Sequence, residues 1–117
     1  MSEGYQERMT RERAQADEAR LQFIQTELES CETFLKLAKT ELSFGEPRHA
    51  AYTLEKAEAA LGQASDYIDK ARERRQETAQ LMASLDVMRS AITQMRSDIE
   101  KSQSPQDLPG RESNNSK

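Results

Sequence analysis

The stretch Glu41–Tyr52, ELSFGEPRHAAY, is the one sharp interruption in about a hundred residues that otherwise favour helix. Gly45 has no Cβ and can adopt the left-handed backbone conformation that ends a helix. Pro47 lacks an N–H group, which costs nothing in the first turn of the next helix. Glu46 stands at the cap position and places negative charge near the positive end of that helix. This stretch therefore predicts two helices joined by a tight corner, which makes them antiparallel neighbours.

Apolar residues on both sides of this corner recur in the heptad pattern of coiled coils. Before the corner, alternate spacings of three and four residues connect Leu21, Ile24, Leu28, Cys31, Leu35, Ala38 and Leu42. After the corner, the same alternation connects Ala50, Leu54, Ala57, Leu61, Ala64, Ile68 and Ala71. Alanine at every seventh position lets two helix axes approach closely. We therefore expect a zipped antiparallel pair with Leu21 near Ala71 and Leu42 near Ala50.

A third apolar stripe follows, out of register with the second. It consists of Leu81, Leu85, Met88, Ile92, Met95 and Ile99. Leaving these side chains in water costs roughly 1.5–3 kcal/mol each, so the stripe must be covered. The first helix carries a second, patchier apolar stripe made of Phe23, Phe34, Leu37 and Phe44. If residues 72–78 form a turn, with Thr78 as a helix cap, the third helix folds back onto the Phe23, Phe34 and Leu37 part of that stripe. If residues 72–78 stay helical, a second chain covers the stripe.

The predicted fold class is accordingly all-α, a three-helix bundle built on an antiparallel hairpin. The alternative is a long two-helix coiled-coil hairpin that dimerises. Val, Ile, Leu and Phe total only 18 of 117 residues, too few for a globular interior but enough to line helix seams. We expect a frayed N-terminus over residues 1–6, a helical domain over residues 7–101, and a disordered tail over residues 102–117, which hold two prolines and no periodicity.

Composition also narrows the functional class. No apolar run is long enough to cross a membrane, and the N-terminal residues do not resemble a secretory signal. The single cysteine, Cys31, excludes an intrachain disulfide framework, so a cytoplasmic protein is expected. A net charge of −4 argues against nucleic acid or an anionic membrane surface as the main ligand.

The residues that bear reactive chemistry do not form a catalytic pattern. His49 and Glu46 have the E-x-x-H spacing found in di-iron helical bundles, but those sites need two such motifs and this chain has one histidine. Cys31 lies on the main heptad stripe and is expected to be a buried, inert thiol. The sequence contains neither a glycine-rich phosphate loop nor a Cys-x-x-Cys pair. We expect no enzyme activity, no cofactor and no small-molecule substrate.

The most plausible function is therefore a non-catalytic helical module that binds a protein partner or associates with itself through an apolar helix face. The candidate partner-binding residues are Met88, Ile92, Met95, Ile99, Phe23, Phe34 and Phe44. The alternative is a basic patch that binds nucleic acid or an anionic membrane surface. Its candidate residues are Lys70, Arg72, Arg74 and Arg75.

The residues around the corner resemble one tetratricopeptide repeat, the helix–turn–helix unit of many protein-binding scaffolds. The matching positions in the first helix are Phe34, Leu37 and Ala38. The matching positions at the turn and in the second helix are Gly45, Ala50, Leu54 and Ala57. The resemblance covers residues 34–57 and implies a helical hairpin that binds protein. Pro47, the absence of a closing proline and the lack of a second repeat depart from the family pattern.

Overall fold

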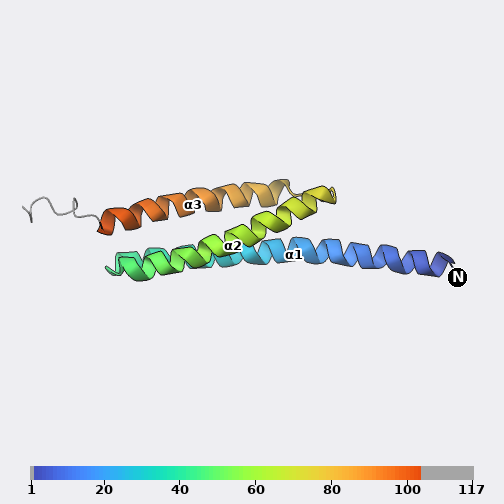
Figure 1. The fold of residues 1–117 in the computed structure, drawn as a ribbon, viewed down its shortest axis with the longest axis horizontal. Coiled ribbons are helices and arrows are strands. Elements are labelled where there is room, and N and C mark those ends of the chain that lie inside the picture. Colours follow the sequence, from blue (N-terminus) through green and yellow to red (C-terminus); the bar gives the residue numbers. More distant parts are fainter. Residues whose placement is uncertain (1, 104–117) are drawn as a thin grey trace, which may run out of the picture.

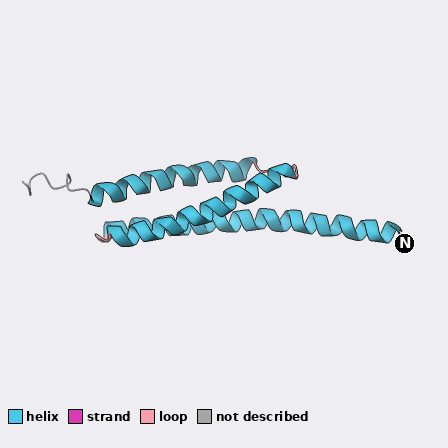
Figure 2. Ribbon diagram, viewed as in Figure 1, coloured by secondary structure: helices cyan, strands magenta, loops and turns pink. Residues whose placement is uncertain are grey.

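A computed structural model of the chain describes the backbone of residues 2–103 and the side chains of residues 4–103. The described chain forms three α-helices: α1 (Ser2–Ser43), α2 (Pro47–Glu73) and α3 (Ala79–Gln103). α1 and α2 make an antiparallel hairpin, and α3 turns back along both of them (Figures 1 and 2). The predicted all-α class and three-helix arrangement are confirmed.

The corner between α1 and α2 forms as the sequence predicts. Gly45 has a φ of 78°, the left-handed conformation that favours glycine. The backbone N–H of Glu46 donates to the carbonyl of Glu41 at 2.9 Å, and that of Gly45 donates to the carbonyl of Leu42 at 3.0 Å. This pair of bonds is the Schellman motif, which satisfies carbonyls left without partners at a helix end. α2 then begins at Pro47, with Glu46 at the N-cap position but without a side-chain cap hydrogen bond.

The hairpin has the predicted register. At the closed end, the hydroxyl of Thr53 donates to the carboxylate of Glu41 at 2.7 Å. Further along, the rings of Phe23 and Tyr67 lie 4.4 Å apart between centroids. A layer of small and medium side chains fills the contact between the axes of α1 and α2, and each has an exposed fraction of 0%: Ile24, Cys31, Ala38, Ala50, Ala57, Ala64 and Ala71. These side chains permit close approach of the two helices and exclude water from their contact.

The connection from α2 to α3 is a turn, and its backbone repeats the geometry of the first corner. The N–H of Gln76 donates to the carbonyl of Ala71 at 2.9 Å, and the N–H of Arg75 donates to the carbonyl of Arg72 at 2.9 Å. Arg75 takes the position that Gly45 takes in the first corner, with a φ of 59°. A side chain in this conformation costs roughly 1–2 kcal/mol, so other contacts must hold the turn.

Those contacts come from Asp17 and Arg20 of α1. The guanidinium of Arg74 donates to the Asp17 carboxylate at 2.7 Å, and the side-chain amide of Gln76 donates to the Asp17 backbone carbonyl at 2.8 Å. Arg20 donates to the side-chain oxygen of Gln76 at 2.9 Å. The turn is thus fastened to α1 by residues more than fifty positions earlier in the chain.

Thr78 occupies the N-cap position of α3, as the sequence suggests, but its hydroxyl does not cap the helix. The Thr78 carbonyl accepts the N–H of Met82 at 2.8 Å, while its hydroxyl faces the Met82 sulfur at 3.6 Å. The carboxylate of Glu77 accepts the N–H of Ala79 at 3.2 Å instead. A carboxylate next to the positive end of a helix is favourable, so Glu77 stabilises the start of α3 in place of the Thr78 hydroxyl.

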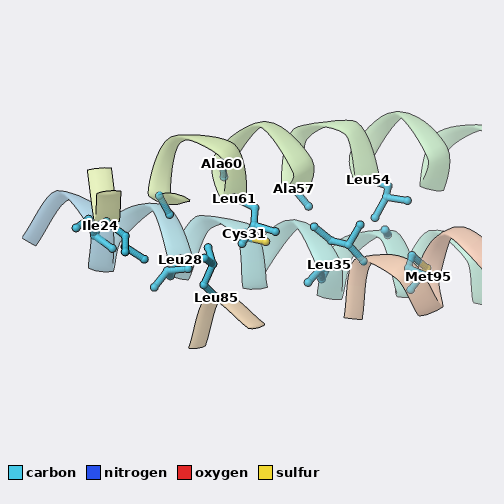
Figure 3. Packing of buried hydrophobic residues seen from close by; sticks show 14 of the residues in the cluster. Ile24, Leu28, Cys31, Leu35, Leu54, Ala57, Ala60, Leu61, Leu85 and Met95 are labelled. Carbon is cyan, nitrogen blue, oxygen red and sulfur yellow. The ribbon is translucent and has the colours of Figure 1, made fainter. Parts of the chain in front are cut away.

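α3 packs on the leucine side of the hairpin. Leu85 points toward Leu28 of α1, and Leu61 of α2 points toward Cys31 (Figure 3). At the rim, Arg96 of α3 forms an ion pair with Glu58 of α2. These larger side chains offer more apolar area than the alanine layer can, and burying that area favours this position for α3.

α3 thus folds back onto the hairpin as expected, but the prediction that it covers the stripe of Phe23, Phe34 and Leu37 is wrong. Phe23 contacts Tyr67, and Phe34 lies beneath the ammonium group of Lys56 at 6.0 Å, so both rings face α2. Leu37 keeps an exposed fraction of 46%.

Two helix boundaries differ from those expected. α1 begins at Ser2 rather than near residue 7, and the side chains of residues 4–16 are all exposed. This part of α1 projects beyond the α2–α3 turn (Figure 1). α3 continues to Gln103, past the expected end at residue 101, and the remainder of the predicted tail lies outside the described residues. Fraying over residues 1–6 stays a prediction.

Candidate interaction surface

Most of the residues predicted on α3 as partner contacts are used inside the chain. Ile92, Met95 and Ile99 are buried, with exposed fractions of 4–8%, and Met88 packs half-buried against the same core. Their apolar stripe is covered by the hairpin, which removes the reason to expect a partner there. In this structure they contribute to folding and are not a free surface.

Three of the exposed large apolar and aromatic side chains, Leu37, Phe44 and Tyr52, lie instead on the flank of the hairpin that faces away from α3. We name this flank the open face. It comprises Phe23, Phe34, Tyr52, Lys56 and Tyr67, which form aromatic and cation–π contacts between α1 and α2, together with Leu37 and Phe44, which heptad spacing from Phe23 places on the same side of α1. The exposed fraction is 76% for Phe44, 62% for Tyr52 and 46% for Leu37. The predicted residues Phe23, Phe34 and Phe44 therefore belong to one surface, while the α3 residues do not.

Heptad geometry explains how the two flanks of α2 differ. Lys56 follows Tyr52 by four residues, so both side chains lie on one side of α2. Glu58 and Ser65 lie on the other side, where they contact Arg96 and Arg89 of α3.

Lys56 organises the centre of the open face. Its ammonium group lies 6.0 Å from the ring centroid of Phe34 and 4.8 Å from that of Tyr52. These distances are within the range of cation–π attraction, which is worth about 0.5–1 kcal/mol at exposed sites. Two rings from different helices are thus held beside one cation, so a partner would meet a preformed surface.

A second aromatic pair lies further along the same flank. Phe23 and Tyr67 contact each other at an interplanar angle of 42°, and the ammonium group of Lys70 lies 4.8 Å from the Tyr67 ring. Sequence reasoning missed Tyr52, Lys56 and Tyr67. Their spacing along α2 places them on one side of the helix, but only the tertiary contacts show that this side borders Phe23 and Phe34.

The predicted basic patch is partly neutralised. Arg74 pairs with Asp17 through Nε at 2.7 Å and through Nη2 at 3.3 Å. Hydrogen bonds from Arg74 and then Arg20 hold the pKa of the Asp17 carboxyl below its ordinary value. Lys70 lies over Tyr67, which leaves Arg72 and Arg75 as the exposed cations without such a described partner. Binding of nucleic acid or an anionic membrane surface by this patch stays a prediction.

Cys31 is buried in the core and His49 is exposed, so they do not form a reactive pair. Cys31 is fully buried in the α1–α2 contact, where burial, together with the nearby Glu32 carboxylate, raises the pKa of its thiol to about 11. His49 is exposed at the start of α2, with Nδ1 lying 3.6 Å from the carboxylate of Glu46. Within the described part of the chain, no group of three or more His, Cys, Asp or Glu side chains is arranged to hold a metal ion.

Comparison with known proteins leaves the chain without a family. No family model, curated protein or solved structure matches it. None of the described helices has the length and apolar character needed to cross a membrane. Function is inferred below from the geometry of the open face.

Proposed function

We propose that this protein is a non-catalytic helical interaction module that binds a protein partner through the open face. The observation that carries the proposal is the exposure of Phe44, Tyr52 and Leu37 on a single flank of the hairpin. The α3 stripe has its own partner within the chain, whereas this flank has none among the described residues.

The chemistry of the open face is that of a protein interface. Aromatic residues are enriched at such interfaces because a rigid ring buries a large area with little loss of side-chain entropy. Tyr52 also has a hydroxyl group that can form a hydrogen bond at a wet rim. Lys56 holds Tyr52 and Phe34 in position, which lowers the entropy cost of binding.

The resemblance of residues 34–57 to a tetratricopeptide-type hairpin supports the same class of function. It implies a scaffold that presents a helix surface to protein. Three residues of the open face, Phe34, Leu37 and Phe44, lie in or next to the matched part of α1.

The proposal assigns no chemical step to the protein. A nucleophilic cysteine needs a thiolate and an adjacent base. Burial raises the pKa of Cys31 to about 11, which keeps the thiol protonated at neutral pH. His49 is exposed whereas Cys31 is buried, so His49 is not available as that base.

Site-specific photo-crosslinking in the source cells tests the proposal. A benzophenone amino acid replaces Phe44 in one variant and Val87 in a control variant. Val87 is a matched control because it is 61% exposed on α3, away from the open face. We expect a discrete protein adduct from position 44 and none from position 87. Identical adducts at both positions, or no adduct at position 44, would contradict the proposal.

A further inference from the structure

The outward side of α1 carries a second heptad stripe. Alternate spacings of four and three residues connect Ala19, Phe23, Thr26, Ser30, Thr33, Leu37, Thr40 and Phe44. We name this set the outer stripe. None of its members is charged, and all are exposed except Phe23 and Ser30, which are partly buried. Because it shares the heptad period of the core stripe, it runs along α1 on the side away from the core without drifting around the helix, and Phe23, whose ring contacts Tyr67, lies at its edge next to α2.

A heptad stripe stays in contact with a second helix over its whole length when that helix carries a stripe of the same period, about 3.5 residues per turn. The outer stripe of another copy has the same period and the same length. We propose that two copies of this chain pair through their outer stripes in an antiparallel coiled coil, with the two-fold axis between residues 31 and 32. This inference rests on the proposed function and names a second copy as the partner.

Side-chain size selects the antiparallel orientation. In this register the largest side chains lie opposite small or medium ones: Phe23 opposite Thr40, Leu37 opposite Thr26, and Phe44 opposite Ala19. Large and small residues that alternate across a seam interdigitate well. In a parallel pair Phe23 would face Phe23, and Ser30 would face Ser30.

Charge selects the register. Glu29 and Lys36 flank the outer stripe on its side away from α2, and the proposed register places Glu29 of each copy opposite Lys36 of the other. A shift of one heptad in one direction brings Lys36 opposite Lys36. A shift in the other direction brings Glu29 opposite Glu29 and places Phe44 against Glu12. Like charges at such positions are destabilising, so of these three registers only the proposed one avoids a clash.

The first experiment measures mass by sedimentation equilibrium across micromolar to millimolar protein. The full chain should approach twice its 13.3 kDa mass as concentration rises. Leu37→Glu places charge in the seam and should leave a monomer throughout the range. Val87→Glu introduces the same charge at another exposed site and should dimerise like the parent chain. Circular dichroism should show equal helix content in all three proteins.

The second experiment exchanges the flanking charges. Glu29→Lys alone and Lys36→Glu alone each create two like-charge contacts and should weaken dimerisation by about five-fold or more. The double variant Glu29→Lys/Lys36→Glu restores opposite charges in the proposed register and should recover most of the affinity. If the double variant is weaker than either single variant, the register is wrong.

The third experiment tests orientation with disulfides. The buried Cys31 thiol is unreactive at neutral pH and can remain in place. The S30C and T33C variants, when mixed and oxidised, should give the mixed disulfide, since Ser30 faces Thr33 of the other copy. Disulfides formed mainly between two S30C copies would indicate a parallel pair and overturn the proposal.

The outcomes separate this inference from the proposed function. A chain that stays monomeric at millimolar concentration but gives a heterologous adduct from position 44 overturns self-pairing and supports the module. A monomer that gives no adduct overturns both. A dimer that Leu37→Glu does not affect overturns the outer stripe as the contact.

Discussion

The two flanks of the α1–α2 hairpin are formed by the same two helices but differ in how far their apolar side chains are exposed. On one flank, α3 covers leucine and isoleucine side chains, such as Leu28 and Leu61, until 5–8% of each stays exposed. On the other, Phe44 and Tyr52 remain 76% and 62% exposed. Burial of apolar residues is favourable on both flanks, but within the described chain only one flank is covered and stabilises the fold. The same substitution made on each flank should therefore change the unfolding free energy by different amounts.

The largest difference is expected between Leu85→Ala and Leu37→Ala, which remove the same atoms. Leu85 is 5% exposed against the hairpin, and its truncation should cost about 2–5 kcal/mol of unfolding free energy because it leaves a cavity. Leu37 is 46% exposed, and its truncation should cost below about 1 kcal/mol. Urea denaturation at a concentration where the chain is monomeric measures both. Equal losses of unfolding free energy in the two variants would contradict the difference between the flanks.

The alanine layer between α1 and α2 should resist enlargement. Ala57→Leu inserts three carbons where the exposed fraction is 0%, and should cost about 1–3 kcal/mol through displaced helices. Ala59→Leu makes the same change two residues further along, at an exposed position, and should be nearly neutral. The thermal unfolding midpoints of the two variants, each compared with that of the parent chain, measure the difference. A neutral Ala57→Leu would indicate looser packing than the structure shows.

The two corners offer a smaller and opposite pair of effects. Gly45→Ala forces a side chain into the left-handed conformation and should destabilise by about 1 kcal/mol. Arg75→Gly relieves the same strain and should stabilise by up to about 1 kcal/mol, although the flexible unfolded chain offsets part of that gain. Both are measured by urea denaturation. Destabilisation by Arg75→Gly would mean that the arginine side chain makes contacts worth more than the strain.

The smallest effect, and the one with a pH signature, concerns Asp17. Its folded-state pKa is lowered by Arg74 and Arg20, so it adds stability above the unfolded-state pKa of about 3.9. That stability is lost as pH falls through the folded-state pKa. Asp17→Asn should thus be less stable than the parent chain near pH 6, and the difference should shrink toward pH 2.

Glu18→Gln is the control for this prediction, because the Glu18 carboxylate interacts with Gln22 of its own helix and has no described bond to the α2–α3 turn. Denaturation midpoints of the three proteins from pH 2 to pH 6 supply the comparison. An Asp17→Asn deficit that stays constant across this range would show that the carboxylate charge does not hold the turn.

Local chemistry and periodicity were sufficient to predict several features of the fold. Gly45 and Pro47 are unambiguous stop and start signals, and they placed the first corner correctly. The alanine repeat from Ala50 to Ala71 predicted the close contact and the register of the hairpin. Each of these features depends on residues near one another in the sequence, or on a period that one helix carries along its whole length.

Local sequence chemistry did not decide whether residues 72–78 form a turn or stay helical, because they contain no Gly, Pro, Asn or Asp. Arg75 takes the left-handed conformation because Asp17 and Arg20, far away in the chain, hold Arg74 and Gln76 in place. The candidate site was only half predictable for a similar reason. Phe34 and Phe44 could be found on α1, but Tyr52 and Lys56 join them only when the helices pair.

What the sequence alone determined is the set of helices, their apolar stripes and the antiparallel hairpin. What only the tertiary structure decided is which side of that hairpin α3 covers. Two stripes of α1 were available to it, and heptad spacing does not distinguish them. The choice depends on the area that three helices bury together and on the contacts that fasten the α2–α3 turn at Asp17. That choice leaves the aromatic flank uncovered by the described helices, and the proposed function depends on this exposure.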